Sequence, residues 1–445
     1  MPSSGSGRRI SGHDEGGTRT GAGARDTGSG GGGASVIDTD AVRAFLEPRH
    51  LDFAARAADF ARASLADRPE PSDDAGGRVE ARLLASALGG AGLLAPIGDG
   101  DLRAACLARE AIAWASPLAD AVWALQALGL TPVLRAGSDA QRDRWVRPVL
   151  EGAALAAFAM TEPEAGSDVA AMRTRAVRDR DGWLLDGGKH LISNAGLADV
   201  YVIFASTDPD AGSRGISCFL VPSDARGLDF DGAQVMSAPH PLGRIALRAC
   251  RIPADALLGE ENRGFMLGMS TLDRLRPTVG AAACGMARRA LDEALAHARA
   301  RRQFGRPLAD FQIVKEKLGR MAIDLGAARL LVYRAAWEAD TAAGRITIPA
   351  AMAKAFATEA AQRIVDEAVQ IVGGPGVLAS HPVERLYRSV RALRIYEGTT
   401  EIQRLIVADA LLRDTETGEP EEAEAAPGSG GGRDAASASG EDALR

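Results

Sequence analysis

The hydrophobic repeat of this chain changes twice along its length, and that change limits the possible folds more than any other feature. From about residue 36 to 156, apolar side chains recur at the spacing of amphipathic helices. From about 157 to 262 they alternate, as in half-buried strands, and Asp181-Gly182 between two such runs predicts a β-hairpin. Helical spacing returns from about 263 to 413. The order predicts a mainly α protein with a small, mostly antiparallel β domain in the middle.

Several helices can be placed from their periodicity and their end residues. Glycine and proline near the expected ends are typical helix boundaries. In the first helical region we expect helices over Leu102 to Trp114, Leu118 to Leu134 and Ala140 to Leu150. In the second we expect them near Leu272 to Arg302, over about 313 to 343, from Pro349 to the Gly373-Gly374 pair, and over Thr400 to Leu412.

The two ends of the chain differ in composition from the rest. Residues 1–35 are rich in glycine and serine, and residues 414–445 are rich in glutamate, alanine, glycine and serine. Such segments bury too little apolar surface to order themselves, so we expect two disordered tails, the second of them acidic.

Charge and cysteine content argue against several classes of function. The net charge of −7 gives no reason to expect nucleic-acid binding, since a phosphate-binding domain usually has an excess of basic residues. The four cysteines form no Cys-x-x-Cys pair and no cluster with histidine, so we expect neither a metal site nor a disulfide framework. The sequence shows no apolar run of membrane-spanning length and no signal-peptide pattern, so we expect a cytoplasmic protein without a membrane partner.

Several short segments carry polar and small residues in patterns suited to ligands. In Phe158 to Asp168, small and hydroxyl residues flank Gly166, where backbone N–H groups can approach an anionic or flat polar ligand. Taken alone, this segment is more simply a polar loop. The other segments are 188–195, 273–277, 301–305 with Gln312, 370–374 and 396–403.

Most of these segments also have an ordinary structural interpretation. Asp273 and Arg276 have the spacing of an i,i+3 ion pair on a helix. Arginines at 301 and 302 suit the C-terminal end of a helix dipole, although an arginine fork also matches a pyrophosphate. Gly373-Gly374 is typical of a helix C-cap.

Glu397 lies in Tyr396-Glu-Gly-Thr-Thr-Glu-Ile-Gln403. Thr400 and Gln403 have capping-box spacing, which places Glu397 just before a helix start. A single glutamate there would by default be a solvated carboxylate favoured by the helix dipole.

Taken in order, these segments resemble the acyl-CoA dehydrogenase family, and the resemblance covers most of the chain between the two tails. It implies an N-terminal helical domain at 36–156, a small antiparallel β-barrel-like domain at 157–262 and a C-terminal four-helix bundle at 263–413. It further implies FAD-dependent α,β-dehydrogenation of a fatty-acyl-type CoA thioester to the 2-enoyl-CoA, a homotetramer, and an electron-transferring flavoprotein as the acceptor.

The resemblance assigns FAD contacts to five of the segments. Thr161 would hydrogen-bond the flavin ring, Ser167 would contact the pyrophosphate side, and Ser193 would lie near flavin N5 and O4. Segments 301–312 and 370–374 would reach the FAD of a neighbouring subunit. The expected FAD contacts are Phe158, Met160, Thr161, Gly166, Ser167, Leu191, Ile192, Ser193, Arg301, Gln303, Phe304, Gln312, Gln370, Gly373, Gly374, Thr399 and Glu401.

The resemblance assigns catalysis to Glu397, which would abstract the α-proton while hydride passes to flavin N5. Gly398 would leave room for the thioester, and the Glu397 N–H would polarise its carbonyl. The expected substrate contacts are Ser167, Asp273, Arg276 and Gly398. Some members of the family place the base at the position of Leu275, and a leucine cannot take a proton. A helix N-terminus lowers a carboxylate pKa whereas burial raises it, so a base near neutrality requires burial to dominate.

The chain departs from the family at Leu191, where an aromatic residue is usual. Loss of that ring removes cover from one flavin edge, which keeps an acyl-CoA oxidase or a flavin monooxygenase open as alternatives. A third alternative is a non-catalytic flavoprotein that binds DNA, against which the acidic tail and Glu397 both argue.

Overall fold

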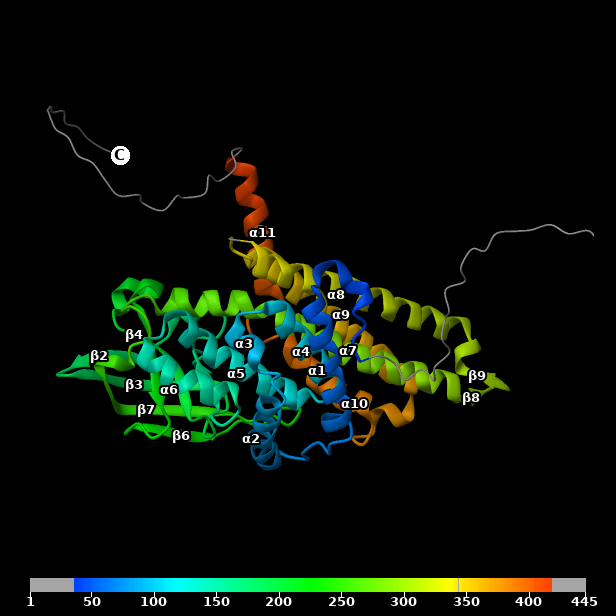
Figure 1. The fold of residues 1–445 in the computed structure, drawn as a ribbon, viewed down its shortest axis with the longest axis horizontal. Coiled ribbons are helices and arrows are strands. Elements are labelled where there is room, and N and C mark those ends of the chain that lie inside the picture. Colours follow the sequence, from blue (N-terminus) through cyan, green and yellow to red (C-terminus); the bar gives the residue numbers. More distant parts are fainter. Residues whose placement is uncertain (1–35, 343, 418–445) are drawn as a thin grey trace, which may run out of the picture. The chain divides into compact units, whose positions relative to one another are not determined.

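Three consecutive parts of the chain form helices, then a sheet, then helices again (Figure 1). The computed structural model describes residues 36–342 and 344–417. The tails expected at 1–35 and 418–445 lie outside these residues, while residues 414–417 belong to the last helix rather than to a tail.

The first part contains six α-helices. They are α1 Pro48–Phe60, α2 Asp74–Gly90, α3 Ala95–Asp99, α4 Leu102–Ala115, α5 Pro117–Ala136 and α6 Asp139–Leu150. Ser116 caps α5 by accepting a hydrogen bond from the Ala119 N–H, and proline occupies the first position of that helix. α5 is apolar and long enough to cross a membrane by composition, which the sequence analysis did not expect. However, 83% of its most apolar stretch is buried inside the fold.

The middle part is a seven-stranded sheet. Its strands are β1 Ala156–Ala159, β2 Arg175–Asp179, β3 Gly182–Ser193, β4 Val200–Ser206, β5 Ile216–Pro222, β6 Leu228–Ala233 and β7 Leu242–Pro253. The order is β1-β4-β2-β3-β7-β6, with β5 on the other side of β4. The predicted hairpin is present, but its two turn residues are Arg180 and Asp181, because Gly182 already pairs with Asp179 as the first residue of β3. Most strand pairs are antiparallel, as expected. β1 and β4, however, pair in parallel over four positions.

The side chains of β4 alternate between two hydrophobic cores. Val200, Val202 and Phe204 belong to the large core shared with the helices, whereas Tyr201 and Ile203 belong to a smaller core on the other face of the sheet. This alternation follows from the two-residue period of a strand. Both faces of β4 are therefore buried, and β1 beside it contacts α5.

The last part is a bundle around α7. Its elements are α7 Gly264–Ala300, a hairpin of β8 Arg302–Gln303 and β9 Arg306–Pro307, α8 Gln312–Thr341, α9 Thr347–Val372, α10 Pro382–Leu393 and α11 Thr400–Thr417. α7 contacts α8, α9, α10 and α4. α7 begins eight residues before the expected start at Leu272, and α10 was not expected from the sequence.

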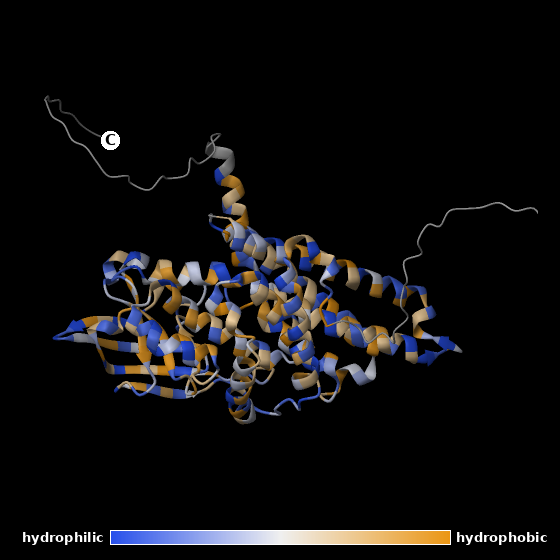
Figure 2. Cartoon of the chain, viewed as in Figure 1, coloured by the Kyte–Doolittle hydropathy of each residue, from blue (hydrophilic) through white to orange (hydrophobic). Residues whose placement is uncertain are grey.

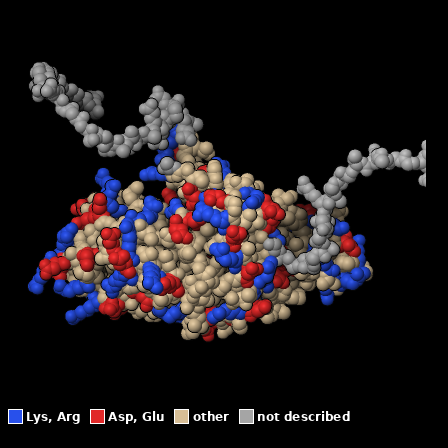
Figure 3. Space-filling view, viewed as in Figure 1, with Lys and Arg blue, Asp and Glu red and all other residues tan. Residues whose placement is uncertain are grey.

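Small residues allow α7 to lie close to its neighbours. A Cβ on Gly280 would lie 2.6 Å from a methyl carbon of Val332, and one on Gly285 would overlap the carbonyl oxygen of Glu110. Hydrophobic and hydrophilic residues alternate along the helices of the bundle, as Figure 2 shows. Basic and acidic side chains are interspersed on the face drawn in Figure 3.

Candidate active site

Glu397 lies in a strained turn between α10 and α11. Its φ of +56° falls in the left-handed region, and Gly398 after it has φ +89°. A non-glycine residue held in this region costs free energy and is often found at functional sites. The sequence analysis placed Glu397 just before this helix, which is where the structure has it.

The cap of α11 differs from the predicted one. The Thr399 hydroxyl, not that of Thr400, accepts a hydrogen bond from the Ile402 N–H at 3.4 Å. Gln403 does not reach back as a capping-box partner. Its side-chain amide donates to the carbonyl oxygens of Glu397 (3.3 Å) and Gly398 (3.1 Å). The buried Gln403 thus binds the turn that carries Glu397.

The Glu397 carboxylate meets an apolar and positively charged environment. Its Oε2 atom is buried and has no hydrogen-bond partner within the described residues. Burial raises the pKa of Glu397, whereas the nearby charges of Arg109, Lys354 and Arg276 act to lower it. The raised pKa shows that burial outweighs these cations, as a base working near neutrality requires.

Arg109 and Asp120 form a buried ion pair near Glu397. The Arg109 guanidinium donates to both Asp120 oxygens, at 2.8 and 2.7 Å, and to the Thr278 hydroxyl at 3.0 Å. Both side chains are 1% exposed. The sequence analysis missed this pair. A charged residue in the apolar helices α4 and α5 was the signal that could have revealed it, since such groups are rarely buried unless paired.

Arg276 turns toward Glu397 and away from solvent. It forms an ion pair with Asp273 as the spacing predicted, and its Nε atom donates to the Glu397 carbonyl oxygen at 3.2 Å. Arg276 is only 5% exposed. Asp273 also accepts a hydrogen bond from Thr347 at the start of α9. Arg276 on α7 therefore also hydrogen-bonds the turn that carries Glu397, which was not predicted from the sequence.

The two segments expected around the flavin ring lie together. The His190 N–H donates to the Thr161 carbonyl oxygen at 2.9 Å. Buried Lys189 donates to Glu162 at 2.7 Å, and Glu162 also accepts from the N–H groups of Arg173 and Thr174. Burial lowers the pKa of Lys189 to about 8. This ion pair joins β3 to the loop after β1 and fixes the segment from Met160 to Ser167.

A bulge in β3 exposes Leu191. Its φ is +55° and its side chain is 50% exposed, while the neighbouring Ile192 is buried. The Leu191 N–H donates to Gln234, and the Ser193 hydroxyl hydrogen-bonds the His240 ring at 2.7 Å. The loop before β7 therefore supports both residues expected to meet the flavin.

The segments assigned to a neighbour's FAD lie away from Glu397. The β8–β9 hairpin lies at the far end of α7 from the sheet (Figure 1). Phe304 in this hairpin has φ +49° and is 91% exposed. Gln370, Gly373 and Gly374 stand at the C-terminal end of α9. Within one chain, these residues are not brought together with the loop at 158–168.

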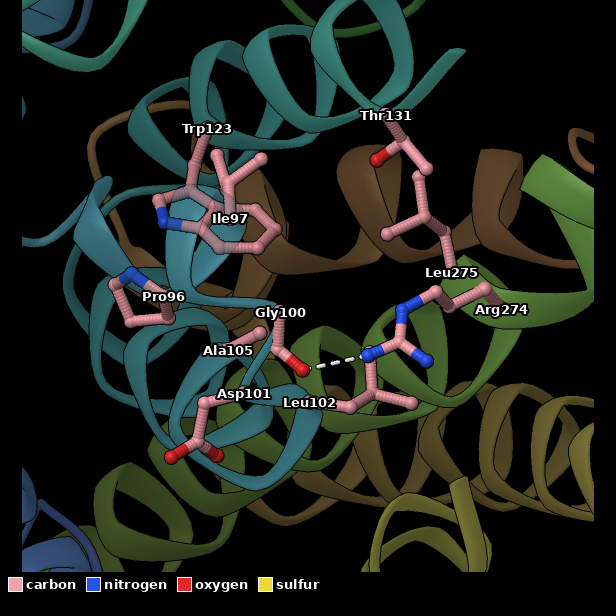
Figure 4. Close-up of a pocket in the computed structure, with 10 residues that line it drawn as sticks. All are labelled: Pro96, Ile97, Gly100, Asp101, Leu102, Ala105, Trp123, Thr131, Arg274 and Leu275. Atoms are coloured by element: carbon pink, nitrogen blue, oxygen red, sulfur yellow. Dashed lines mark hydrogen bonds between the residues drawn. The ribbon is translucent and has the colours of Figure 1, made fainter. Parts of the chain in front are cut away.

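A cavity lies between α3, α4, α5 and α7 (Figure 4). Leu275, at the position where some relatives carry the base, lines it together with Trp123 and Ile97. Arg274 closes one side by donating to the Gly100 carbonyl oxygen at 2.6 Å. The wall combines these apolar side chains with the polar groups of Asp101 and Thr131, and the enclosed space is small, about 20 Å³.

The residues present fit FAD. A Cβ added to Gly166, Gly373 or Gly374 would meet no atom within 4 Å, so these backbones stand open to a ligand. The Thr400 hydroxyl is buried without a partner in the described chain. Helices on either side of a sheet, the adjoining segments at 158–168 and 188–195, and a glutamate with a buried, unpartnered Oε2 are the features that this fold brings to the site.

Family models match three consecutive parts of the chain. The N-terminal domain of acyl-CoA dehydrogenases matches residues 47–153, the middle domain 157–253 and the C-terminal domain 262–412. The chain belongs to the acyl-CoA dehydrogenase family. It is an oxidoreductase that uses FAD to dehydrogenate an acyl-CoA thioester, and the fold class predicted from the sequence is confirmed.

Individual relatives cover most of the chain. The human mitochondrial short-chain specific acyl-CoA dehydrogenase is 41% identical over 329 residues, which is 73% of this chain and 78% of the relative. The structure of butyryl-CoA dehydrogenase from Megasphaera elsdenii has a TM-score of 0.77 at 33% identity and covers 83% of this chain and 99% of its own. A glutaryl-CoA dehydrogenase from Mycobacterium smegmatis in complex with FADH2 has a TM-score of 0.77 at 28% identity, with 86% and 98% covered.

Proposed function

We propose that Glu397 is the base that removes the α-proton of the acyl-CoA substrate. The observation that carries this proposal is the buried Glu397 Oε2, which has no partner in the described residues although three cations stand near it. A buried carboxylate oxygen without a partner, held by a strained turn, adds little to stability and is free to accept a proton.

The backbone of the same turn supports the reaction. The Glu397 N–H donates no hydrogen bond to another group in the described chain, so it is available to the thioester carbonyl. A donor at that oxygen is worth about 3–4 kcal/mol when charge develops there. A side chain on Gly398 would lie 2.5 Å from the Gln403 amide nitrogen, so only glycine leaves this space open. FAD, when bound, accepts the hydride that leaves the β-carbon.

We propose the FAD and substrate contacts expected from the sequence as the binding residues. The joined loops at 158–168 and 188–195 support the flavin contacts, and the hydrogen bond from Arg276 to the Glu397 carbonyl places Arg276 beside the proposed base. We further propose a short acyl group, because two of the relatives act on short-chain or butyryl thioesters by name.

We also propose a homotetramer. The exposed Phe304 and the open Gly373-Gly374 backbone could then complete the FAD site of a neighbouring subunit. An electron-transferring flavoprotein as the acceptor and a cytoplasmic location remain predictions from the sequence.

The test is the variant Glu397→Gln, which keeps size and polarity but cannot accept the proton. We expect it to bind FAD and butyryl-CoA while anaerobic flavin bleaching slows by about 10²–10⁴-fold. Glu151→Gln, a change at a surface carboxylate paired with Arg147, is the control and should bleach at the parent rate. Bleaching of Glu397→Gln at nearly the parent rate would place the base elsewhere.

A further inference from the structure

Two consecutive carbonyl groups hold the Glu397 turn in place. The Glu397 carbonyl accepts from Arg276 and Gln403, and the Gly398 carbonyl accepts from Gln403 and from the Lys354 ammonium. The donors come from three different helices, α7, α9 and α11. Because both residues of the turn have positive φ, these bonds stabilise a backbone that would otherwise relax.

Lys354 differs from the other two donors in its burial and its charge. Its side chain is 0% exposed, and its Nζ atom lies 2.7 Å from the Gly398 oxygen. It forms no salt bridge within the described part of the chain, unlike Arg276, which is paired with Asp273. A buried ammonium that meets only a neutral acceptor needs a countercharge nearby.

Glu397 is the anion with the largest effect on the Lys354 ammonium. The charged groups that act on Lys354, in order of effect, are Glu397, Arg276, Glu401 and Glu359. Burial lowers the pKa of Lys354 to about 8, and Glu397 opposes this lowering most strongly. In return, Lys354 is one of the three cations that oppose the raised pKa of Glu397.

We propose that Lys354 is a positioning residue for proton abstraction, which fixes the Gly398 carbonyl and keeps the Glu397 carboxylate ionised. This proposal rests on Glu397 being the base. The two roles can be separated, because a hydrogen-bond donor without charge can replace the first role but not the second.

The two roles affect different parts of a pH profile. Proton abstraction needs ionised Glu397, so the rate of flavin reduction falls as pH falls through the Glu397 pKa. Loss of a nearby positive charge raises that pKa and moves the acid limb to higher pH. At pH values above the acid limb, Glu397 is fully ionised and the rate of flavin reduction reaches a plateau. A lower plateau rate in a variant therefore indicates that the turn is misplaced. The other groups acting on Glu397, which are Arg109 on α4, Asp120 on α5 and Arg276 on α7, stay unchanged in the variants.

The experiment measures anaerobic reduction of the FAD-loaded full chain by saturating butyryl-CoA from about pH 5.5 to 9. Lys354→Met removes donor and charge, Lys354→Gln keeps a donor, and Lys354→Arg keeps the charge. We expect the acid limb to move up by about 1 pH unit in Lys354→Met and Lys354→Gln and to stay in place in Lys354→Arg. We expect the plateau to fall by about 10- to 100-fold in Lys354→Met and by less in Lys354→Gln.

Each outcome decides one part of the proposal. An unchanged acid limb in both Lys354→Met and Lys354→Gln would show that the charge of Lys354 does not affect the pKa of Glu397. An unchanged plateau in Lys354→Met would show that the turn keeps its position without the Lys354 hydrogen bond. If Lys354→Met fails to hold FAD, Lys354→Gln and Lys354→Arg still give the comparison of charge. Glu397→Gln, measured alongside, distinguishes a failure here from a failure of the base assignment, because only the latter leaves Glu397→Gln active.

Discussion

Replacement of Asp120 by asparagine should both destabilise the protein and move the acid limb of its pH profile to lower pH. Asp120 is 1% exposed and accepts two hydrogen bonds from the equally buried Arg109. Asparagine cannot carry the charge, so the guanidinium would remain buried without a countercharge. Breaking a buried pair in this way costs about 3–5 kcal/mol.

This cost can be converted into a melting temperature. With about 2.1 cal/mol/K of unfolding entropy per residue and roughly 380 ordered residues, the total is about 0.8 kcal/mol/K. A loss of about 3–5 kcal/mol then lowers the melting temperature by about 4–6 °C. Release of FAD fluorescence on heating measures it, and Asp139→Asn, at a side chain that is 98% exposed, is the matched control.

The effect on catalysis has a definite sign. The Asp120 charge raises the pKa of Glu397, so its removal lowers that pKa and keeps Glu397 ionised to lower pH. The acid limb should therefore move opposite to that of Lys354→Met. A loss of less than about 1 kcal/mol, or a limb that moves to higher pH, would refute the account of this pair.

Two further predictions concern the flavin edge and the assembly. Leu191→Trp should slow reoxidation of the reduced enzyme by air relative to Leu191→Ala, because a ring at this half-exposed bulge would cover the flavin edge. Equal rates of reoxidation in stopped-flow measurements would show that Leu191 does not lie at the flavin. Light scattering should show a tetramer for the parent protein. Phe304 is 91% exposed in the single chain, so we expect it to pack against a neighbouring subunit, and Phe304→Asp should weaken assembly and lower FAD occupancy. A monomer with full FAD occupancy would contradict the shared site.

The sequence predicted those features that depend on local pattern. The period change located the sheet, Asp181-Gly182 located the hairpin, and the turn before α11 located Glu397. The parallel pairing of β1 with β4 was missed, because it joins strands some forty residues apart and leaves no local pattern. α10 was not predicted, although Pro382 at its first position is a typical helix start.

The residues that surround Glu397 were missed for a different reason. Arg109, Asp120 and Lys354 come from three helices whose meeting point depends on the tertiary fold. Each nevertheless interrupts an apolar or alanine-rich stretch, where a charged side chain is expected to be paired or functional. Such isolated charges were therefore visible in the sequence, but their partners were not.

Of the three cations that act on Glu397 among the described residues, Lys354 is the one that forms no ion pair of its own. Arg109 is paired with Asp120 and Arg276 with Asp273, which leaves Lys354 to balance Glu397. Unpaired charges on Arg109 and Arg276 would lower the pKa of Glu397 further and weaken it as a base, whereas loss of every cation would leave burial to favour the protonated carboxyl. The Lys354 ammonium acts against burial, so it favours the ionised form of the base without cancelling the raised pKa.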